Sequence, residues 1–458
     1  MYVLCSSSCP FISLIIRAQA DIANSICNTV KAFDTSKTPS LEEDAKYKPD
    51  IAFYDSATHD PEKNLTSFQR MQMFVEFKRG NTSDPFHGGE HMSFEKLFEN
   101  TCATRGQIIL YSTQLQTYQF RTGFFSIGIF GEVARLFRWD RAGAIVSDPI
   151  PYYQSGNLEL VEFLCRFDMM DRDQRGLDPT VSDASPDEAA AFENAINTVV
   201  ADKENRLLKE LLDSVGEVGN YPRKKIEIPT GSDGSGDPAS YIVGRSIANA
   251  RSPTGRATRC FVAMSGETKE LVFLKDSWRP DIPGMKGGAH WFGRLKGARN
   301  ISAFLHGSDV RARRVATTTG TAGTPTDIFQ HTLTNLHSED YGGPQMMMGY
   351  IHYRTVQCEF YVPLHMFKDS KHLVEIILDI IIGMILLPSP QLQPLNLLPA
   401  IEDLYERGIL HRDISAANIM ITIDGSGRLI DLDMARSVNG VGARLTVRTV
   451  SCRLRTDS

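Results

Sequence analysis

The fold of this chain is decided near its C-terminal end, where residues 409–420 read ILHRDISAANIM. The triplet His-Arg-Asp ends at Asp413, and Asn418 follows after four further residues. An aspartate at this spacing can orient a hydroxyl group for attack on a phosphate, and the asparagine can offer its amide oxygen to a magnesium ion. Asp431 follows in the segment LIDLD at residues 429–433, where the main metal ligand is expected. These residues predict a site for a triphosphate bound to magnesium.

The segment between the two motifs is expected to bring them together. Residues 419–423 and 427–430 predict two strands, and the tripeptide Asp-Gly-Ser at 424–426 is typical of a hairpin turn. A hairpin places Asn418 and Asp431 at the same end of the strand pair, so that both side chains can bind one metal ion.

Two upstream segments complete the pattern of a protein kinase. Residues 270–275 read ELVFLK, which is typical of the strand that presents a phosphate-binding lysine, here Lys275. The turn SPTGR at 252–256 is expected above the phosphates through Gly255, although it lacks the pattern G-x-G-x-x-G. The catalytic residues predicted in this way are Asp413, Arg412, His411 and Lys275.

Four segments make the sequence similar to the fungal-type protein kinase family. They are LKDSWR at 274–279, HRDIS at 411–415 with NIM at 418–420, LID at 429–431 and, further upstream, RWDRAGA at 138–144. The resemblance implies a bilobal kinase fold and transfer of a phosphoryl group from ATP to serine or threonine hydroxyls of protein substrates. It also implies ATP and Mg²⁺ as cofactors. The nucleotide would be bound by Lys275, Gly255, Asn418 and Asp431, and the metal ion by Asn418 and Asp431.

The sequence departs from the kinase pattern in three places. No glutamate occurs between Glu270 and Glu339, so the helix expected after Lys275 lacks the acid that normally pairs with this lysine. Four prolines between residues 388 and 399 interrupt the helix that should run into the catalytic loop. Only 22 residues follow Arg436. Because an activation segment and the helices of a large lobe need more chain, the sequence predicts a truncated large lobe and little or no kinase activity for this polypeptide.

A second constellation lies in the N-terminal half of the sequence. Asp50 follows a proline, Glu76 and Lys78 are two residues apart in a predicted strand, and Gln107 and Tyr111 share one face of a predicted helix. This order resembles the PD-(D/E)xK nuclease-like fold. Asp50 and Glu76 could hold a magnesium ion while Lys78 assists a water molecule that attacks a phosphodiester. The alternative is an edge strand with a Glu–Lys ion pair and a polar helix face.

Changes in composition predict an α+β fold class with four regions. The second region is expected to be a small α/β domain, with a restriction-endonuclease-like fold as the open alternative. The third is expected to contain a helix that begins at Ser185-Pro186 and to end in a flexible joint, the glycine- and serine-rich segment at 230–236. The four regions are an N-terminal helical or irregular segment at 1–46, the α/β domain at 47–170, the helical segment and linker at 171–236, and the kinase-like domain at 237–458.

The overall composition limits the function classes. With 42% hydrophobic and 23% charged residues the chain is typical of soluble globular proteins. A net charge of -6 argues against broad binding of nucleic acid, which needs a basic surface, but leaves local basic patches open. The eight cysteines include no C-x-x-C pair, which indicates free thiols in a reducing compartment, the cytoplasm or the nucleus. The apolar runs at 11–16 and 376–387 are too short to span a bilayer, so neither secretion nor membrane insertion is expected.

Overall fold

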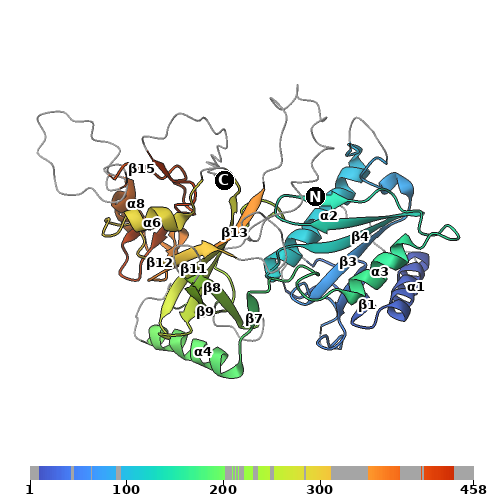
Figure 1. Ribbon diagram of the computed structural model, residues 1–458, viewed down its shortest axis with the longest axis horizontal. Coiled ribbons are helices and arrows are strands. Elements are labelled where there is room, and N and C mark those ends of the chain that lie inside the picture. Colours follow the sequence, from blue (N-terminus) through green and yellow to red (C-terminus); the bar gives the residue numbers. More distant parts are fainter. Residues whose placement is uncertain are drawn as a thin grey trace, which may run out of the picture. The chain divides into compact units, whose positions relative to one another are not determined.

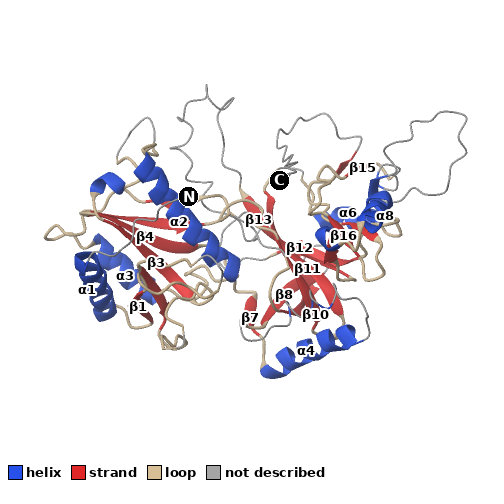
Figure 2. Ribbon diagram, turned by 180° about the vertical axis from the view of Figure 1, so that it is seen from behind, coloured by secondary structure: helices blue, strands red, loops and turns tan. Residues whose placement is uncertain are grey.

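The computed structural model describes residues 10–42, 46–62, 64–88, 94–201, 209, 212, 215, 221–230, 236–247, 252–282, 285–310, 349–381, 404 and 407–437. The chain divides into two compact units, and each is described by itself. Unit 1 comprises residues 1–179, 250–257 and 312–351, and unit 2 comprises residues 180–249, 258–311 and 352–458. Figures 1 and 2 show the elements of both units. Among the described residues, no helix is long and apolar enough to cross a membrane.

Unit 1 is built on a six-stranded sheet with the strand order β1-β2-β3-β4-β5-β6. The strands are β1 (Val30–Asp34), β2 (Ile51–Asp55), β3 (Met71–Lys78), β4 (Phe124–Phe130), β5 (Val133–Trp139) and β6 (Ala144–Val146). β3 and β4 are parallel, and the other neighbours are antiparallel. A parallel pair needs a crossover connection, which contains the helix α2 (Glu99–Tyr118) and the short 3₁₀ helix η1 (Asn81–Ser83).

Helices cover both faces of this sheet (Figure 1). α1 (Pro10–Ile26) and α3 (Glu159–Met169) contribute to one apolar cluster, to which Val75 of β3 belongs. α2 contributes to a second cluster, to which Phe74 belongs. Because side chains alternate along a strand, Glu76 and Lys78 lie on the same face of β3 as Phe74, toward α2.

Unit 2 contains a seven-stranded sheet with the order β12-β13-β11-β10-β9-β8-β7. The strands are β7 (Val181–Asp183), β8 (Lys224–Thr230), β9 (Gly236–Val243), β10 (Arg259–Ser265), β11 (Leu271–Pro280), β12 (Phe304–Asp309) and β13 (Tyr350–Gln357). The helix α4 (Pro186–Ala201) packs against β9 and β10, and the short helix α6 (Gly288–Arg294) packs against β12. Figure 2 shows these strands in red and both helices in blue.

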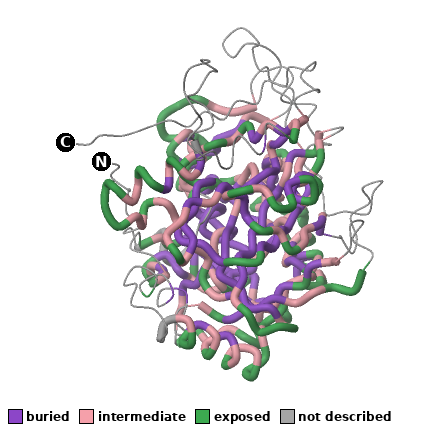
Figure 3. Tube along the Cα trace, turned by 90° about the vertical axis from the view of Figure 1, so that its left-hand side faces the viewer, coloured by how far each residue is buried: buried purple, intermediate pink, exposed green. Residues whose placement is uncertain are grey.

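A second group of elements in unit 2 carries the C-terminal motifs. It consists of α8 (Ser370–Ile381), the 3₁₀ helix η3 (Leu364–Met366), a three-stranded sheet of β14 (Val362–Pro363), β16 (Ile419–Ile421) and β17 (Gly427–Leu429), and the pair β15 (Ile409–Leu410) and β18 (Arg436–Ser437). One apolar cluster includes residues of the large sheet, α8 and the β16–β17 hairpin. Figure 3 shows that buried residues lie mainly inside and exposed ones outside. The predicted α+β class is confirmed.

Two predictions about the third region have different outcomes. α4 begins at Pro186 as predicted, and Ser185 and Glu188 form a reciprocal cap, because the Glu188 amide donates to Ser185 Oγ at 3.2 Å and the Ser185 amide donates to Glu188 Oε2 at 2.9 Å. The segment at 230–236 does not separate two domains. Thr230 at its start pairs with Gly236 at its end across β8 and β9, so it connects neighbouring strands of one sheet in unit 2. The proline-rich stretch between residues 388 and 399 lies outside the described residues.

Candidate active site

Lys275 is buried within the large sheet of unit 2 and lies next to two carboxylates. It belongs to β11, and its side chain is 3% exposed. Its Nζ atom lies 2.6 Å from Oδ1 of Asp431 and 2.6 Å from Oδ2 of Asp433. The structure therefore brings together the predicted phosphate-binding lysine and the predicted main metal ligand.

The next residue of β11, Asp276, belongs to a separate charge cluster. Its carboxylate lies 2.6 Å from Arg259 Nη2, 2.6 Å from His352 Nε2 and 3.0 Å from Arg354 Nε. Successive side chains of a strand point to opposite faces, so Asp276 points away from the face that carries Lys275. Asp276 is therefore not the acidic partner of Lys275.

The hairpin predicted between the two C-terminal motifs is also confirmed. β16 and β17 are antiparallel, with Ile419 opposite Leu429. Just beyond this pair, the amide of Ile430 donates a hydrogen bond to the carbonyl of Asn418 at 3.0 Å. The backbones of Asn418 and of the residue before Asp431 are thus linked directly. Asn418 is buried, and its Nδ2 donates to the carbonyl of Asp413 at 2.8 Å, which fixes the loop that contains Asp413 to the same hairpin.

His411 ties the loop that contains Asp413 to the segment that precedes Asp431. Its Nε2 lies 2.9 Å from the carbonyl of Ile430, and its Nδ1 accepts from the amide of Asp413 at 3.3 Å. Burial lowers the pKa of His411 and outweighs the opposite effects of its hydrogen bond and of the nearby carboxylates. A neutral imidazole that donates through Nε2 and accepts through Nδ1 satisfies both contacts. His411 therefore positions the loop, whereas Arg412 is exposed.

Backbone strain occurs at the same two segments. Arg412 has φ of 68° and Asp431 has φ of 65°, in the left-handed region that L-residues rarely adopt. Such residues cost on the order of 1–3 kcal/mol each and cluster at functional sites, where the surrounding structure maintains them. Here the strain falls on one residue of each predicted catalytic motif.

The residues present fit a magnesium ion bound together with phosphates. Mg²⁺ prefers oxygen ligands and is usually held by one or two protein groups plus phosphate oxygens and waters. Asn418 uses its amide nitrogen for the bond to Asp413, which leaves the amide oxygen as the ligand end. Within the described ranges, no group of three or more His, Cys, Asp or Glu residues could hold a metal alone. Asn418 and Asp431 are thus the residues that would hold the ion, with the nucleotide completing its coordination.

Gly255 lies in a part of the chain that belongs to unit 1. Its amide donates to the carbonyl of Arg141 at 2.8 Å, and Arg141 Nη1 donates to the carbonyl of Pro253 at 3.3 Å. Its φ of 86° favours glycine at this position. The role of Gly255 above nucleotide phosphates stays a prediction.

In unit 1 the structure assembles the second constellation. Lys78 Nζ lies 2.6 Å from Glu76 Oε1 and 2.8 Å from Gln107 Oε1. Gln107 Nε2 donates to the hydroxyl of Tyr111 at 2.9 Å, and Asp50 Oδ2 accepts from the amide of Phe77 at 2.8 Å. The C-terminal end of β3, the residue before β2 and the facing side of α2 thus contribute to one polar cluster.

Two carboxyl groups of this cluster are buried near each other. Burial and the charge of Asp50 raise the pKa of Glu76 to about 8, although Lys78 acts in the opposite direction. Burial also raises the pKa of Asp50, against the hydrogen bond from Phe77 and the charge of Lys78. The second oxygen of Glu76, Oε2, is buried and has no hydrogen-bond partner among the described residues. A cation at this point would satisfy Oε2 and relieve the repulsion between the carboxylates.

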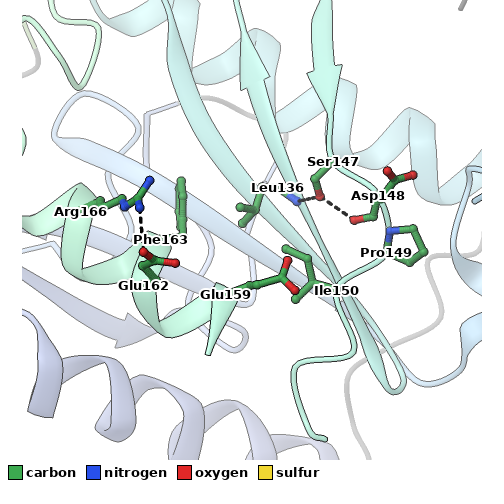
Figure 4. A pocket seen from close by; sticks show the side chains of 9 residues that line it. All are labelled: Leu136, Ser147, Asp148, Pro149, Ile150, Glu159, Glu162, Phe163 and Arg166. Carbon is green, nitrogen blue, oxygen red and sulfur yellow. Dashed lines mark hydrogen bonds and ion pairs between the residues drawn. The ribbon is translucent and has the colours of Figure 1, made fainter. Parts of the chain in front are cut away.

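A separate pocket in unit 1 contains none of the predicted site residues (Figure 4). It has a volume of about 320 Å³ and lies between α3, the middle of β5 and the segment after β6. Its lining residues are Leu136, Ser147, Asp148, Pro149, Ile150, Glu159, Glu162, Phe163 and Arg166. Arg166 pairs with Glu162 at 2.7 Å, and both side chains are largely exposed.

Comparison with known proteins gives the family. The sequence pattern of the family described as fungal protein kinase matches residues 48–389 and 395–451. The chain therefore belongs to the fungal protein kinase family, and its fold is protein kinase-like. The match omits residues 390–394, inside the proline-rich stretch that interrupts the predicted helix.

Two individual similarities are more limited. The probable serine/threonine-protein kinase mkcF of Dictyostelium discoideum is 46% identical over 50 residues, which are 11% of this chain and 7% of that protein. The chain thus matches only a small part of the length of this relative. A solved structure of the ROP18 kinase domain in complex with AMP-PNP and sucrose is 13% identical, with a TM-score of 0.25, over 57% of this chain and 69% of that chain.

The sequence did not reveal the part played by Asp433. It shows an additional aspartate two residues after Asp431 and, separately, no glutamate partner for Lys275. The structure places Asp433 against Lys275. Two features of the sequence together could have revealed it. The helix after Lys275 has no glutamate, and an additional aspartate, Asp433, follows Asp431.

Proposed function

We propose that unit 2 binds ATP with Mg²⁺ and carries the residues for transfer of the terminal phosphoryl group to serine or threonine hydroxyls of protein substrates, with little or no transfer expected from this polypeptide. The observation that carries this proposal is the 2.6 Å contact between Lys275 and Asp431, next to a hairpin that is hydrogen-bonded to the Asp413 loop. A lysine, two metal-binding oxygen groups and an aspartate for the hydroxyl are the parts that phosphoryl transfer requires.

Each residue has a defined role in this proposal. Lys275 binds phosphate oxygens with its ammonium group, and Asn418 and Asp431 hold the metal ion. When bound, Mg²⁺ neutralises negative charge on the phosphates. Asp413 orients the substrate hydroxyl and accepts its proton, while the neutral His411 keeps the Asp413 loop in place.

Nucleotide binding is tested by thermal denaturation of the full chain with Mg²⁺ and ADP. We expect ADP to stabilise the wild type and to give little or no stabilisation in Asp431→Ala. Asp183→Ala is a matched control, because this aspartate also belongs to unit 2 and its side chain is 71% exposed. Equal stabilisation of the wild type and Asp431→Ala would overturn the proposal.

Group transfer is tested separately from binding. The chain is incubated with γ-labelled ATP and a mixture of proteins, and labelled serine and threonine residues are identified. Because Asp413 acts on the hydroxyl and not on the nucleotide, Asp413→Ala should lower any transfer by roughly 100-fold or more while ADP still stabilises the protein. Transfer that is unchanged in Asp413→Ala would exclude Asp413 from this role.

A second candidate function belongs to unit 1. We propose that Asp50 and Glu76 bind a divalent cation and that Lys78 assists cleavage of a phosphodiester in a nucleic acid. The proposal is supported by the buried Oε2 of Glu76, which has no hydrogen-bond partner in the described part of the chain, and by the contacts that fix Lys78. The competing interpretation is a network that only holds α2 on the sheet.

The two interpretations of this cluster predict different results with Mg²⁺ or Mn²⁺. A metal site gives a binding isotherm that is lost in Asp50→Ala, and metal-dependent cleavage of DNA or RNA that is lost in Lys78→Ala. A structural network gives neither, and both substitutions then only lower the melting temperature. Asp34→Ala, in the neighbouring strand β1, is the control for general loss of negative charge.

We further infer a reducing compartment, the cytoplasm or the nucleus, for the protein. The described cysteines Cys27, Cys102, Cys165, Cys260 and Cys358 are all free thiols, which supports this assignment. Fluorescence microscopy of the tagged full chain would test it, and a signal in the secretory pathway would contradict it.

A further inference from the structure

The helix that follows the lysine strand has no acidic residue. In protein kinases a glutamate on this helix pairs with the lysine and orients it toward the phosphates. Here the helix is α6, with the sequence GAHWFGR, and no glutamate occurs between Glu270 and Glu339. Lys275 nevertheless lies in a buried position, where an ammonium group without a partner would be very costly. Its partner must therefore come from another element.

The carboxylate of Asp433 lies where this partner is needed. Asp433 is 2% exposed, and its Oδ2 is 2.6 Å from Lys275 Nζ. Asp431 contacts the same ammonium group through Oδ1 at 2.6 Å. If Asp431 serves a metal ion, Asp433 is the carboxylate that remains available to hold the lysine.

α6 is shaped to leave room for this carboxylate. A Cβ atom added at Gly288 would lie 2.8 Å from Asp433 Oδ1, closer than real Cβ contacts. The start of the helix is held by a different group, because the amide of Ala289 donates to the hydroxyl of Tyr353 at 2.7 Å. The acid next to Lys275 thus belongs to the segment of Asp431 and not to the helix, and the helix has a glycine at the point of contact.

We propose that Asp433 is the positioning residue of Lys275 and replaces the helix glutamate of other kinases. This inference rests on the proposed binding of ATP and Mg²⁺ by unit 2. Lys275 is held by the strand β11, and Asp433 is held by the turn after the β16–β17 hairpin. Their contact therefore does not require an acid on α6. The lysine of this chain is consequently oriented by the same segment that supplies the metal ligand.

The test measures the affinity of the full chain for ADP in the presence of Mg²⁺ and, separately, for adenosine. Asp433→Asn and Asp433→Gly should each weaken ADP binding by at least tenfold, because Lys275 is then poorly oriented toward the phosphates. Adenosine binding should change by less than threefold, since adenosine has no phosphate. A role in folding alone would instead affect both ligands or neither.

The most informative variant places the carboxylate on the helix α6 instead of at position 433. Because the Cβ position of residue 288 adjoins Asp433 Oδ1, an aspartate introduced there can place its carboxylate near Lys275. The double variant Gly288→Asp, Asp433→Gly should therefore recover ADP affinity to within about threefold of the wild type. Gly288→Asp alone should be destabilised, because two carboxylates then compete for one space.

Failure of this inference is distinguishable from failure of the proposed function. If the wild type does not bind ADP with Mg²⁺, the proposed function is wrong. If the wild type binds ADP and Asp433→Asn binds it equally well, the function stands and the positioning role of Asp433 is refuted. Loss of binding in Asp433→Gly without recovery in the double variant would also contradict it.

Discussion

At the scale of single residues, this chain stabilises several buried charges by surrounding each with a specific partner set. Asp276 and Lys275 are neighbours on one strand, yet each faces its own cluster, cations around Asp276 and carboxylates around Lys275. The alternation of a strand could be predicted from the sequence, and so could the meeting of Lys275 and Asp431. The partners of Asp276 could not, because they come from two other strands, β10 and β13, whose pairing the local pattern does not specify.

The first prediction concerns Asp276. Burial alone would raise its pKa, but Arg354, His352 and Arg259 hold the pKa well below its ordinary value. Since the folded pKa is the lower one, the carboxylate stabilises the fold above pH ~4, and this stabilisation is lost as the pH falls further.

Asp276→Asn should therefore lower the free energy of unfolding at pH 7 by about 3–5 kcal/mol, because two arginines lose their buried partner. Urea denaturation measures the loss, which should shrink in acid below pH ~4. The control Asp183→Asn should change stability by less than about 0.5 kcal/mol. A similar small effect in both variants would contradict the account of the cluster.

The second prediction concerns Glu76, whose pKa is raised to about 8 by burial and by Asp50. A raised pKa means that the folded state retains the proton at higher pH than the unfolded state, so stability falls as the pH rises from ~4.5 to about 8. Glu76→Gln removes this titration and should raise the free energy of unfolding by on the order of 3 kcal/mol above pH 8.

Thermal denaturation without divalent cations, between pH 5 and 9, measures this effect. The difference between Glu76→Gln and the wild type should be small near pH 5 and grow toward pH 9. Added Mg²⁺ should favour the wild type if Glu76 binds metal. A difference that does not depend on pH would show that Glu76 is not the group that titrates.

At the scale of elements, the β16–β17 hairpin and α8 form the support of the proposed site. The amide of Gly427 donates to Asp379 Oδ2 of α8 at 2.7 Å, and Asn300 Nδ2 donates to the carbonyl of Asp379 at 3.1 Å. The hairpin and the start of α4 were predictable because turn and cap residues act locally. The connection at 230–236 was not, because a glycine- and serine-rich composition is shared by linkers and by loops within a sheet.

The third prediction concerns the contact between Gly427 of the hairpin and α8. A Cβ atom at Gly427 would lie 2.6 Å from the carbonyl oxygen of Ile376 in α8, so Gly427→Ala must displace the helix or the strand. We expect it to lower the free energy of unfolding by roughly 1–3 kcal/mol and to weaken nucleotide binding. Gly293→Ala in α6 is the control, because a Cβ there meets no atom within 4 Å and alanine favours a helix. Equal behaviour of the two variants in chemical denaturation would refute the tight contact.

At the scale of the whole molecule, the two units carry two separate sets of polar residues. The fold class and the family could be predicted from short motifs, because phosphoryl transfer tolerates few residue types at fixed spacings. The residues of the N-terminal cluster were also found from their spacing. Their close contacts depend on the crossover that brings α2 over β3, which no local pattern specifies.

The fourth prediction is that the ligand of one unit protects that unit. Hydrogen exchange is compared for the full chain with Mg²⁺ and ADP and with Mg²⁺ alone. Peptides that cover β11 and residues 411–433 should exchange more slowly with ADP, whereas peptides that cover residues 48–78 should not change. Protection confined to residues 48–78 would place the nucleotide in unit 1.

The most direct test is an experimental structure of the full chain with a non-hydrolysable ATP analogue and Mg²⁺. We predict one metal ion at ~2.0–2.1 Å from Asn418 Oδ1 and from a carboxylate oxygen of Asp431, with Lys275 Nζ at the phosphates. A nucleotide bound elsewhere, or a metal ion that touches neither Asn418 nor Asp431, would contradict the account.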